Sequence, residues 1–151
     1  MIFNTEKSSL NILKKYALKY KSDKINHGYL EQYNKHFYKD RFKKKNILEI
    51  GIKRKTSQSP GASSLKMWKK YFPNSTINGI DIDSINRNYR EDNINIYIGD
   101  QSDEYFLKSV IKDIGRLDII IDDGSHINEL TLKSYNYLFQ HLNQGGIYVI
   151  E

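Results

Sequence analysis

The sequence predicts an α/β fold in which a parallel sheet of about five strands is flanked by helices and preceded by two N-terminal helices. Short apolar runs alternate with helical patterns from about residue 45 onward, and no repeat or low-complexity linker interrupts them. Strict alternation of strands and helices implies parallel strands joined by right-handed crossovers. The run Leu117 to Ile121 is almost wholly apolar, which is typical of a central strand buried on both faces.

The composition is that of one soluble globular domain. Hydrophobic residues make up 38% of the 151 residues and charged residues 28%, which argues against a disordered or membrane protein. No apolar run approaches the roughly 20 residues that span a bilayer. Because cysteine is absent, disulfides and thiolate zinc sites are excluded. The N-terminus lacks the pattern of a signal peptide, so we expect a cytoplasmic protein.

The net charge of +6 raises the question of a nucleic acid or an anionic membrane as partner. The basic residues are spread along the chain, with local concentrations at residues 14–15, 41–45 and 53–55. Runs of charge are usually solvated faces. We therefore expect neither a nucleic-acid nor a membrane partner.

Two helices are predicted in an N-terminal helical segment, residues 1–44. Thr5 can cap the first, which carries apolar side chains at helical spacing: Leu10, Leu13, Ala17 and Tyr20. The second runs from about Tyr29 to Phe42, with Tyr29, Tyr33 and Phe37 on one face. The link between them, residues 22–28, is polar and rich in turn formers.

Residues 45–151 are predicted to form a Rossmann-like domain. Its strands are expected at Asn46–Ile50, Thr76–Ile82, Ile94–Ile98, Leu117–Ile121 and Ile147–Ile150. The intervening helices are expected at Ser63–Phe72, from the cap Ser102-Asp103-Glu104 to Gly115, and at Asn128–Leu142. Trp68 and Tyr71 lie at helical spacing and are predicted to pack rather than to recognise a ligand.

Acidic residues end each of the first four predicted strands: Glu49, Asp81, Asp100 and the pair Asp122-Asp123. In a parallel sheet of this kind, ligands bind outside the carboxyl ends of the strands, where the strand order reverses. Gly51 follows the first strand and allows the backbone to come close to a ligand. The sequence therefore predicts a ligand site at this edge of the sheet.

The residue types at this edge suit a nucleoside. A carboxylate at the end of the second strand can accept hydrogen bonds from both ribose hydroxyls. The first turn reads Gly51-Ile52-Lys53-Arg54 and lacks the G-x-G-x-x-G pattern that packs a pyrophosphate against a helix N-terminus. This weakens the case for NAD and favours a nucleoside without phosphates, such as S-adenosylmethionine.

Four motifs resemble those of class I methyltransferases: Ile47-Leu48-Glu49-Ile50-Gly51, Gly79-Ile80-Asp81, Gly99-Asp100-Gln101-Ser102 and Gly145-Gly146-Ile147-Tyr148-Val149. Three others are similar to the metal-dependent sugar O-methyltransferases of macrolide biosynthesis, of the mycinamicin type: Ser64 to Lys69, Asp122 to His126, and Ser22-Asp23-Lys24 with His27-Gly28-Tyr29 and Tyr33. Each motif alone is a weak signal, whereas their order and spacing together are specific.

The resemblance implies a role for each site residue. Cofactor-binding roles fall to Glu49, Gly51, Asp81, Asp100, Gln101 and Asp122. Among these, Asp81 would hold the ribose diol, and Asp100 with Gln101 would neighbour the adenine. Asp123 would be a metal ligand and His126 the base that takes the proton from a sugar hydroxyl. For Asp23, His27 and Tyr29 two roles stay open: tying the N-terminal helices to the domain, or lining the cofactor pocket.

General chemistry agrees with these roles. A sugar hydroxyl is a poor nucleophile at neutral pH, so its methylation needs a divalent ion, a base, or both. Oxygen ligands without thiols suit Mg²⁺. We therefore expect S-adenosylmethionine and Mg²⁺ as cofactors, and a small-molecule or glycan acceptor.

The predicted sheet stops at its fifth strand, whereas class I methyltransferases have seven. The resemblance implies that C-terminal strands are missing and that an aspartate following the position of Glu151 completes the metal site. We expect such a fragment to bind its cofactor but to turn over little, and to self-associate through an exposed sheet edge. Two alternatives stay open, an NAD-linked oxidoreductase and a non-catalytic cofactor-binding or assembly module.

Overall fold

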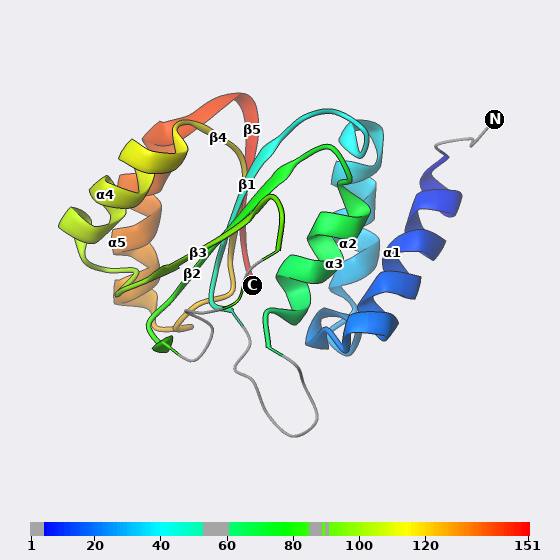
Figure 1. The fold of residues 1–151 in the computed structure, drawn as a ribbon, viewed down its shortest axis with the longest axis horizontal. Helices are drawn as coiled ribbons and strands as arrows, with labels where there is room; N and C mark the ends of the chain where they lie inside the picture. Colours follow the sequence, from blue (N-terminus) through cyan, green and yellow to red (C-terminus); the bar gives the residue numbers. More distant parts are fainter. Residues whose placement is uncertain (1–4, 53–60, 85–88, 90) are drawn as a thin grey trace.

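A computed structural model describes residues 5–52, 61–84, 89 and 91–151. It has three layers, with a five-stranded parallel sheet between two groups of helices (Figure 1). The helices are α1 (Glu6–Tyr20), α2 (Tyr29–Phe37), α3 (Ser63–Tyr71), α4 (Glu104–Ile114) and α5 (Asn128–Leu138). The strands are β1 (Asn46–Ile50), β2 (Thr76–Asp81), β3 (Ile94–Ile98), β4 (Leu117–Asp122) and β5 (Leu142–Ile150). The predicted fold class is confirmed.

The strand order is β3-β2-β1-β4-β5, and every neighbouring pair is parallel. The chain first moves outward from β1 to β3, then returns to place β4 on the other side of β1. The order therefore reverses between β1 and β4. In open α/β sheets this reversal leaves a crevice at the carboxyl ends of the two strands.

The two faces of the sheet are covered by different helices, α1 to α3 on one face and α4 with α5 on the other (Figure 1). Successive strand residues point to opposite faces. Ile47 accordingly packs in a cluster with α1, α2 and α3, whereas Leu48 packs in a cluster with α4 and α5. Trp68 and Tyr71 are fully buried in the first cluster, which confirms that they pack.

The N-terminal segment is part of this architecture. Leu13 and Ala17 of α1 and Leu30 and Phe37 of α2 lie in the same apolar cluster as the strand residue Ile47. The helix caps follow local rules, since the Thr5 side chain accepts from Ser8 N–H at the start of α1. The N-terminal helices thus share the apolar core on this face of the sheet, and α1 packs against α2 and α3.

Several predicted boundaries are wrong by a few residues. The second helix ends at Phe37, and residues 38–40 form a 3₁₀ turn in which no side chain is buried, so the apolar face that supports the helix stops there. Helix α5 ends at Leu138 and is also followed by a 3₁₀ turn. Smaller corrections put the end of α3 at Tyr71 and that of β2 at Asp81, and extend β4 to Asp122.

The start of β5 is the largest correction. The strand begins at Leu142 rather than at Ile147. Leu142 pairs with Leu117 and Ile147 pairs with Ile119, so residues 143–146 form an irregularity within the strand. The sequence predicts a loop in that stretch, because its glycines and polar residues do not show the alternation of apolar and polar side chains that marks a regular strand.

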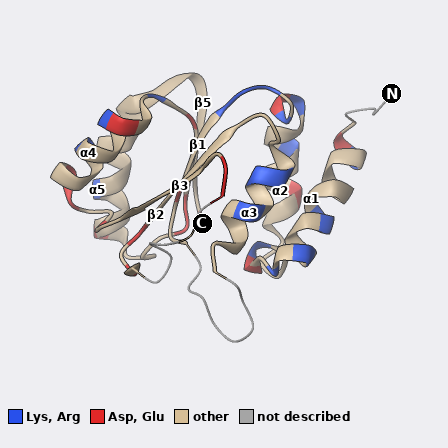
Figure 2. Ribbon diagram, viewed as in Figure 1, with Lys and Arg blue, Asp and Glu red and all other residues tan. Residues whose placement is uncertain are grey.

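Charged residues do not form a single patch in the part of the chain described. Lys and Arg lie on several helices, including α1, α2 and α3 (Figure 2). The predicted basic stretch at residues 53–55, with Lys53 and Arg54 of the first turn, lies outside the described residues. Among the helices that are described, none has the length and apolar character to cross a membrane.

Candidate functional site

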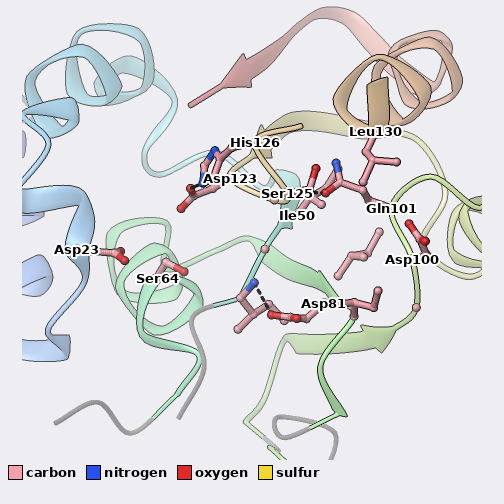
Figure 3. A pocket seen from close by; sticks show the side chains of 16 residues that line it. Asp23, Ile50, Ser64, Asp81, Asp100, Gln101, Asp123, Ser125, His126 and Leu130 are labelled. Atoms are coloured by element: carbon pink, nitrogen blue, oxygen red, sulfur yellow. Dashed lines mark hydrogen bonds and ion pairs between the residues drawn. The ribbon is translucent and has the colours of Figure 1, made fainter. Parts of the chain in front are cut away.

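The carboxyl ends of β1 to β4 surround a cavity of about 370 Å³ (Figure 3). It lies at the predicted position, where the strand order reverses. The structure brings together six of the eight predicted site residues in its lining: Gly51, Asp81, Asp100, Gln101, Asp123 and His126. Sequence reasoning did not single out the other polar lining residues Ser64 and Ser125 as site residues.

Gly51 is required by the packing of two loops against each other. Its φ is +85°, in the left-handed region. A Cβ at this position would lie 1.9 Å from the carbonyl oxygen of Asp123. Because the chain after β1 crosses the chain after β4 at backbone contact, only glycine fits here.

Asp81 holds the two loops that border the cavity on the β2 side. Its Oδ2 accepts from the N–H of Ile52 at 2.8 Å (Figure 3). Its Oδ1 accepts from the N–H of Asp83 at 2.8 Å. A carboxylate oxygen can accept more than one hydrogen bond. Asp81 can therefore fix its loops and still accept from ligand hydroxyls.

Asp100 and Gln101 are adjacent in sequence but have different surroundings. Asp100 is exposed, and hydrogen bonds from the backbone and hydroxyl of Ser102 lower its pKa. Gln101 is buried; its Oε1 accepts from Ser125 N–H at 2.8 Å and its Nε2 donates to Ser134 Oγ at 3.2 Å. Gln101 thus ties the loop after β3 to the loop after β4.

Asp122 lies beneath the cavity and is absent from its lining. Only 2% of it is exposed, and its Oδ2 accepts from Ser134 Oγ at 2.8 Å and from the Tyr148 hydroxyl at 3.3 Å. Burial raises the pKa of Asp122, although these hydrogen bonds oppose the change. The contact of Asp122 with the cofactor stays a prediction. In the structure, its side chain supports the loop that follows β4.

Glu49 also lies below the cavity, with none of its side chain exposed. Its Oε1 is 3.0 Å from Nζ of Lys24. Burial raises the pKa of Glu49 to about 7, against the lowering effects of Lys24 and Ser64. Its cofactor-binding role likewise stays a prediction.

The most unexpected group at the site is Lys24, from the 3₁₀ helix η1 (Asp23–Ile25). Its ammonium is buried and forms ion pairs with Asp123 Oδ2 at 2.8 Å, with Glu49 and with Glu151. Burial alone would lower the pKa of Lys24, but attraction to the three carboxylates outweighs it and raises the pKa. The Tyr33 hydroxyl also donates to Glu151.

Sequence reasoning missed the role of Lys24 because it lies in a polar, turn-rich link, where a lysine is expected in solvent. The signal that could have found it is the motif Ser22-Asp23-Lys24, which stands among the family motifs. Only the packing of η1 against the sheet shows that this lysine points inward.

His126 lies at the rim of the cavity, on the loop between β4 and α5 (Figure 3). Its Nε2 is 3.6 Å from Oδ1 of Asp123, and 61% of its side chain is exposed. Its φ is +54°, an uncommon value for a residue with a side chain. The imidazole can therefore reach a ligand in the cavity while it faces a carboxylate.

A smaller cavity of about 140 Å³ adjoins this site and shares three of its residues, Asp23, Asp123 and His126. The stacked rings of His27 and Tyr29 also line it, with centroids 5.5 Å apart. Asp23 therefore lines the larger cavity, as one of the two open interpretations predicts, whereas His27 and Tyr29 line only the smaller one.

Two acidic side chains at this site have the chemistry of metal ligands. Asp123 and Glu151 offer carboxylate oxygens, the donors that Mg²⁺ prefers. Both point to the Lys24 ammonium, however, and the described residues contain no group of three or more His, Asp or Glu side chains that could hold a metal. The donors are of the right kind, but those described do not make a complete ligand set.

The chain matches no protein-family model. It is 39% identical over 136 residues to 8-demethyl-8-alpha-L-rhamnosyl tetracenomycin-C 2'-O-methyltransferase of Streptomyces olivaceus. It is also 39% identical over 126 residues to mycinamicin VI 2''-O-methyltransferase of Micromonospora griseorubida. The matches cover 89% and 83% of this chain. The chain is a homologue of sugar O-methyltransferases.

The similar solved structures include a methyltransferase of the same kind. The MycE methyltransferase of mycinamycin biosynthesis, in complex with Mg, SAH and mycinamycin VI, matches 92% of this chain with a TM-score of 0.85 and 38% identity. These findings confirm the resemblance to macrolide sugar O-methyltransferases and the Rossmann-like fold. The chain spans about 36% of the tetracenomycin relative, 31% of the mycinamicin relative and 36% of the MycE chain.

Replacing Gly51 with Ala tests the backbone contact. We expect the free energy of unfolding to fall by about 3 kcal/mol or more, because the new Cβ adds a steric clash to the cost of a left-handed φ. Urea denaturation measures the change. Gly28→Ala is the control, since Gly28 has φ +71° and a Cβ there would meet nothing within 4 Å. Equal losses in the two variants would contradict the contact.

Proposed function

We propose that this chain forms the cofactor-binding part of an S-adenosylmethionine-dependent methyltransferase that acts on a hydroxyl of a sugar or glycoside. The observation that carries the proposal is the cavity at the reversal of strand order, in which Asp81, Asp123 and His126 converge. Homology to enzymes named as sugar O-methyltransferases supports the same reaction.

The cofactor is proposed to lie along the carboxyl ends of β1, β2 and β3. Asp81 would accept hydrogen bonds from the ribose hydroxyls, and the backbone at Gly51 would run beside the ribose and methionine. The adenine would lie toward Asp100 and Gln101. Ile82 lines this cavity and is 74% exposed, so a purine face would cover an apolar side chain that is otherwise in water.

His126 is the proposed base. S-adenosylmethionine, when bound, supplies a methyl group already activated by its sulfonium, so positioning of the acceptor provides much of the remaining rate. The His126 imidazole would accept the proton of the acceptor hydroxyl as that oxygen takes the methyl group from the sulfonium. Asp123, 3.6 Å away, would stabilise the protonated ring.

Magnesium is proposed as a second cofactor because MycE is described in complex with Mg and SAH. Asp123 is its proposed ligand. The described donors leave the ligand set incomplete, so the roles derived above belong to the protein's own side chains. The acceptor is proposed to be a glycoside, since MycE is also described with mycinamycin VI.

The remaining interpretations have different support. An NAD-linked oxidoreductase gains none from the relatives described above, which are named methyltransferases. A non-catalytic module and self-association through β5 stay predictions, which analytical sedimentation would test. The division into a helical segment, residues 1–44, and a cofactor-binding domain, residues 45–151, is likewise proposed, as is a cytoplasmic location.

Calorimetry with S-adenosylhomocysteine tests the cofactor assignment. We expect measurable binding to the unaltered chain, and affinity at least about 10-fold lower in Asp81→Ala, because two charge-assisted hydrogen bonds are lost. Asp113→Ala removes an exposed acid from α4 and should bind within about twofold of the unaltered chain. Circular dichroism checks the fold of each variant.

Two calorimetric results would count against this assignment. Absence of heat at millimolar S-adenosylhomocysteine with the unaltered, folded chain would contradict the cofactor. Binding that is unchanged in Asp81→Ala would contradict the ribose contact while leaving the cofactor in place.

Replacing His126 with Ala, in a version of the chain extended to the length of its relatives, tests the proposed base. Transfer of a labelled methyl group to a methyl L-rhamnoside is expected to fall by about 100-fold or more, while affinity for S-adenosylhomocysteine changes less than about threefold. His141→Ala serves as the control, since His141 lies in the turn after α5 and should leave both quantities unchanged. Undiminished transfer in His126→Ala would remove it as the base.

A further inference from the structure

We infer that Lys24 is a positioning residue whose ammonium holds the carboxylates of Glu49, Asp123 and Glu151 in a single arrangement. The N-terminal segment would then be a working part of the site that the sheet forms. The inference rests on the geometry of this acidic cluster, so it stands or falls separately from the identity of the cofactor.

Lys24 makes hydrogen bonds to two of the carboxylates and an ion pair with the third, Glu49. An ammonium has three N–H donors and no acceptor. Lys24 Nζ is 2.8 Å from Asp123 Oδ2 and 3.0 Å from Glu49 Oε1, and it also donates to Glu151. One nitrogen from η1 thus reaches one carboxylate from β1, one from the loop after β4 and one at the end of β5.

The burial of the cluster makes the cation necessary. Only 1% of the Lys24 side chain is exposed, with 0% for Glu49 and 5% for Glu151. Each of the three carboxylates has an oxygen within 3.0 Å of the same ammonium, so the carboxylates lie close to one another. Like charges at such short distances repel strongly where water is excluded. Among the described ion pairs, those of the three carboxylates involve only Lys24 and, for Asp123, His126. In the described part of the chain, no other lysine or arginine forms an ion pair with these carboxylates and could take the place of the Lys24 ammonium.

The arrangement sets the direction of Asp123. Lys24 holds Oδ2, which leaves Oδ1 facing the His126 imidazole. The following loop is held by a hydrogen bond from its backbone to a side chain, since Ser125 N–H donates to Gln101 Oε1 at 2.8 Å. Loss of the ammonium would free the Asp123 carboxylate to turn, and the loop would lose one of its anchors.

A simpler role would be to neutralise the fully buried Glu49 and nothing more. The two roles differ in what happens when Lys24 and Glu49 are removed together. If Lys24 only neutralises Glu49, removing both charges should restore both the stability and the order of the loop. Positioning predicts that stability recovers while the loop that carries Asp123 and His126 stays loose, because Asp123 and Glu151 still lack their cation.

The first test is Lys24→Met. Breaking a buried pair should lower the urea midpoint by about 1 M or more. Hydrogen exchange of the amides of Gly124, Ser125 and Ile127, all of which have hydrogen-bond acceptors, should become at least about tenfold faster. Lys14→Met is the matched control, since Lys14 pairs with Glu31 at the surface and should change neither quantity measurably.

The second variant, Lys24→Met with Glu49→Gln, separates the two roles. We expect the urea midpoint to recover by at least half and loop exchange to stay at least about tenfold faster than in the unaltered chain. Loop exchange that returns to its original rate together with stability would overturn the inference, as would unchanged exchange in Lys24→Met.

A measurement without substitution covers the case in which neither variant folds. In the chain labelled with ¹⁵N-lysine, the Lys24 ammonium should give a resonance that persists at neutral pH, where solvent-exposed ammonium protons exchange too fast to be seen. Assignment to Lys24 can use its proximity to the Tyr33 ring, 5.9 Å from Nζ. Absence of such a resonance would overturn the inference.

Discussion

The backbone contact between the ends of β1 and β4 is the constraint on which the site depends. Gly51 lies against the carbonyl of Asp123, and Asp123 N–H donates to the carbonyl of Ile50 at 2.9 Å. This contact fixes the loop that carries His126 relative to the loop that borders the cavity on the β2 side. A side chain at position 51 would separate the two halves of the site.

The second requirement is electrostatic. Parallel strands bring their carboxyl ends together, so acids that are distant in sequence become neighbours. The molecule compensates each differently: Asp81 with backbone N–H groups, Asp122 with hydroxyls and Gln101, and Glu49 with the Lys24 ammonium. Four acids, Asp23, Asp81, Asp100 and Asp123, line the cavity, and Asp100 is the exposed one among them.

Much of the fold was predictable because it depends on local patterns. Apolar runs such as Leu117 to Ile121 identify buried parallel strands, and the alternation with helices sets the topology. The location of the cavity then follows, since acidic strand ends must meet at one edge. The start of β5 was not predictable in this way, because residues 143–146 interrupt the strand without alternating.

The candidate site was predictable as a set of positions but not as a set of environments. Glu49 and Asp122 occupy strand ends as expected, yet the structure buries both below the cavity, because side chains alternate along a strand. Lys24 was invisible as a site residue, since burying a lysine depends on three partners that are 25, 99 and 127 residues away along the chain. Long-range pairing of this kind has no local signature.

We propose above that the cavity at the ends of β1 to β4 binds a phosphate-free adenine nucleoside. Chemical-shift mapping of the ¹⁵N-labelled chain with S-adenosylhomocysteine tests it most directly. We expect the shifted amides to cluster at Gly51, Asp81, Gln101 and Ser125, and NADH at the same concentration to leave them unchanged. Shifts confined to other surfaces, or equal shifts with NADH, would contradict it.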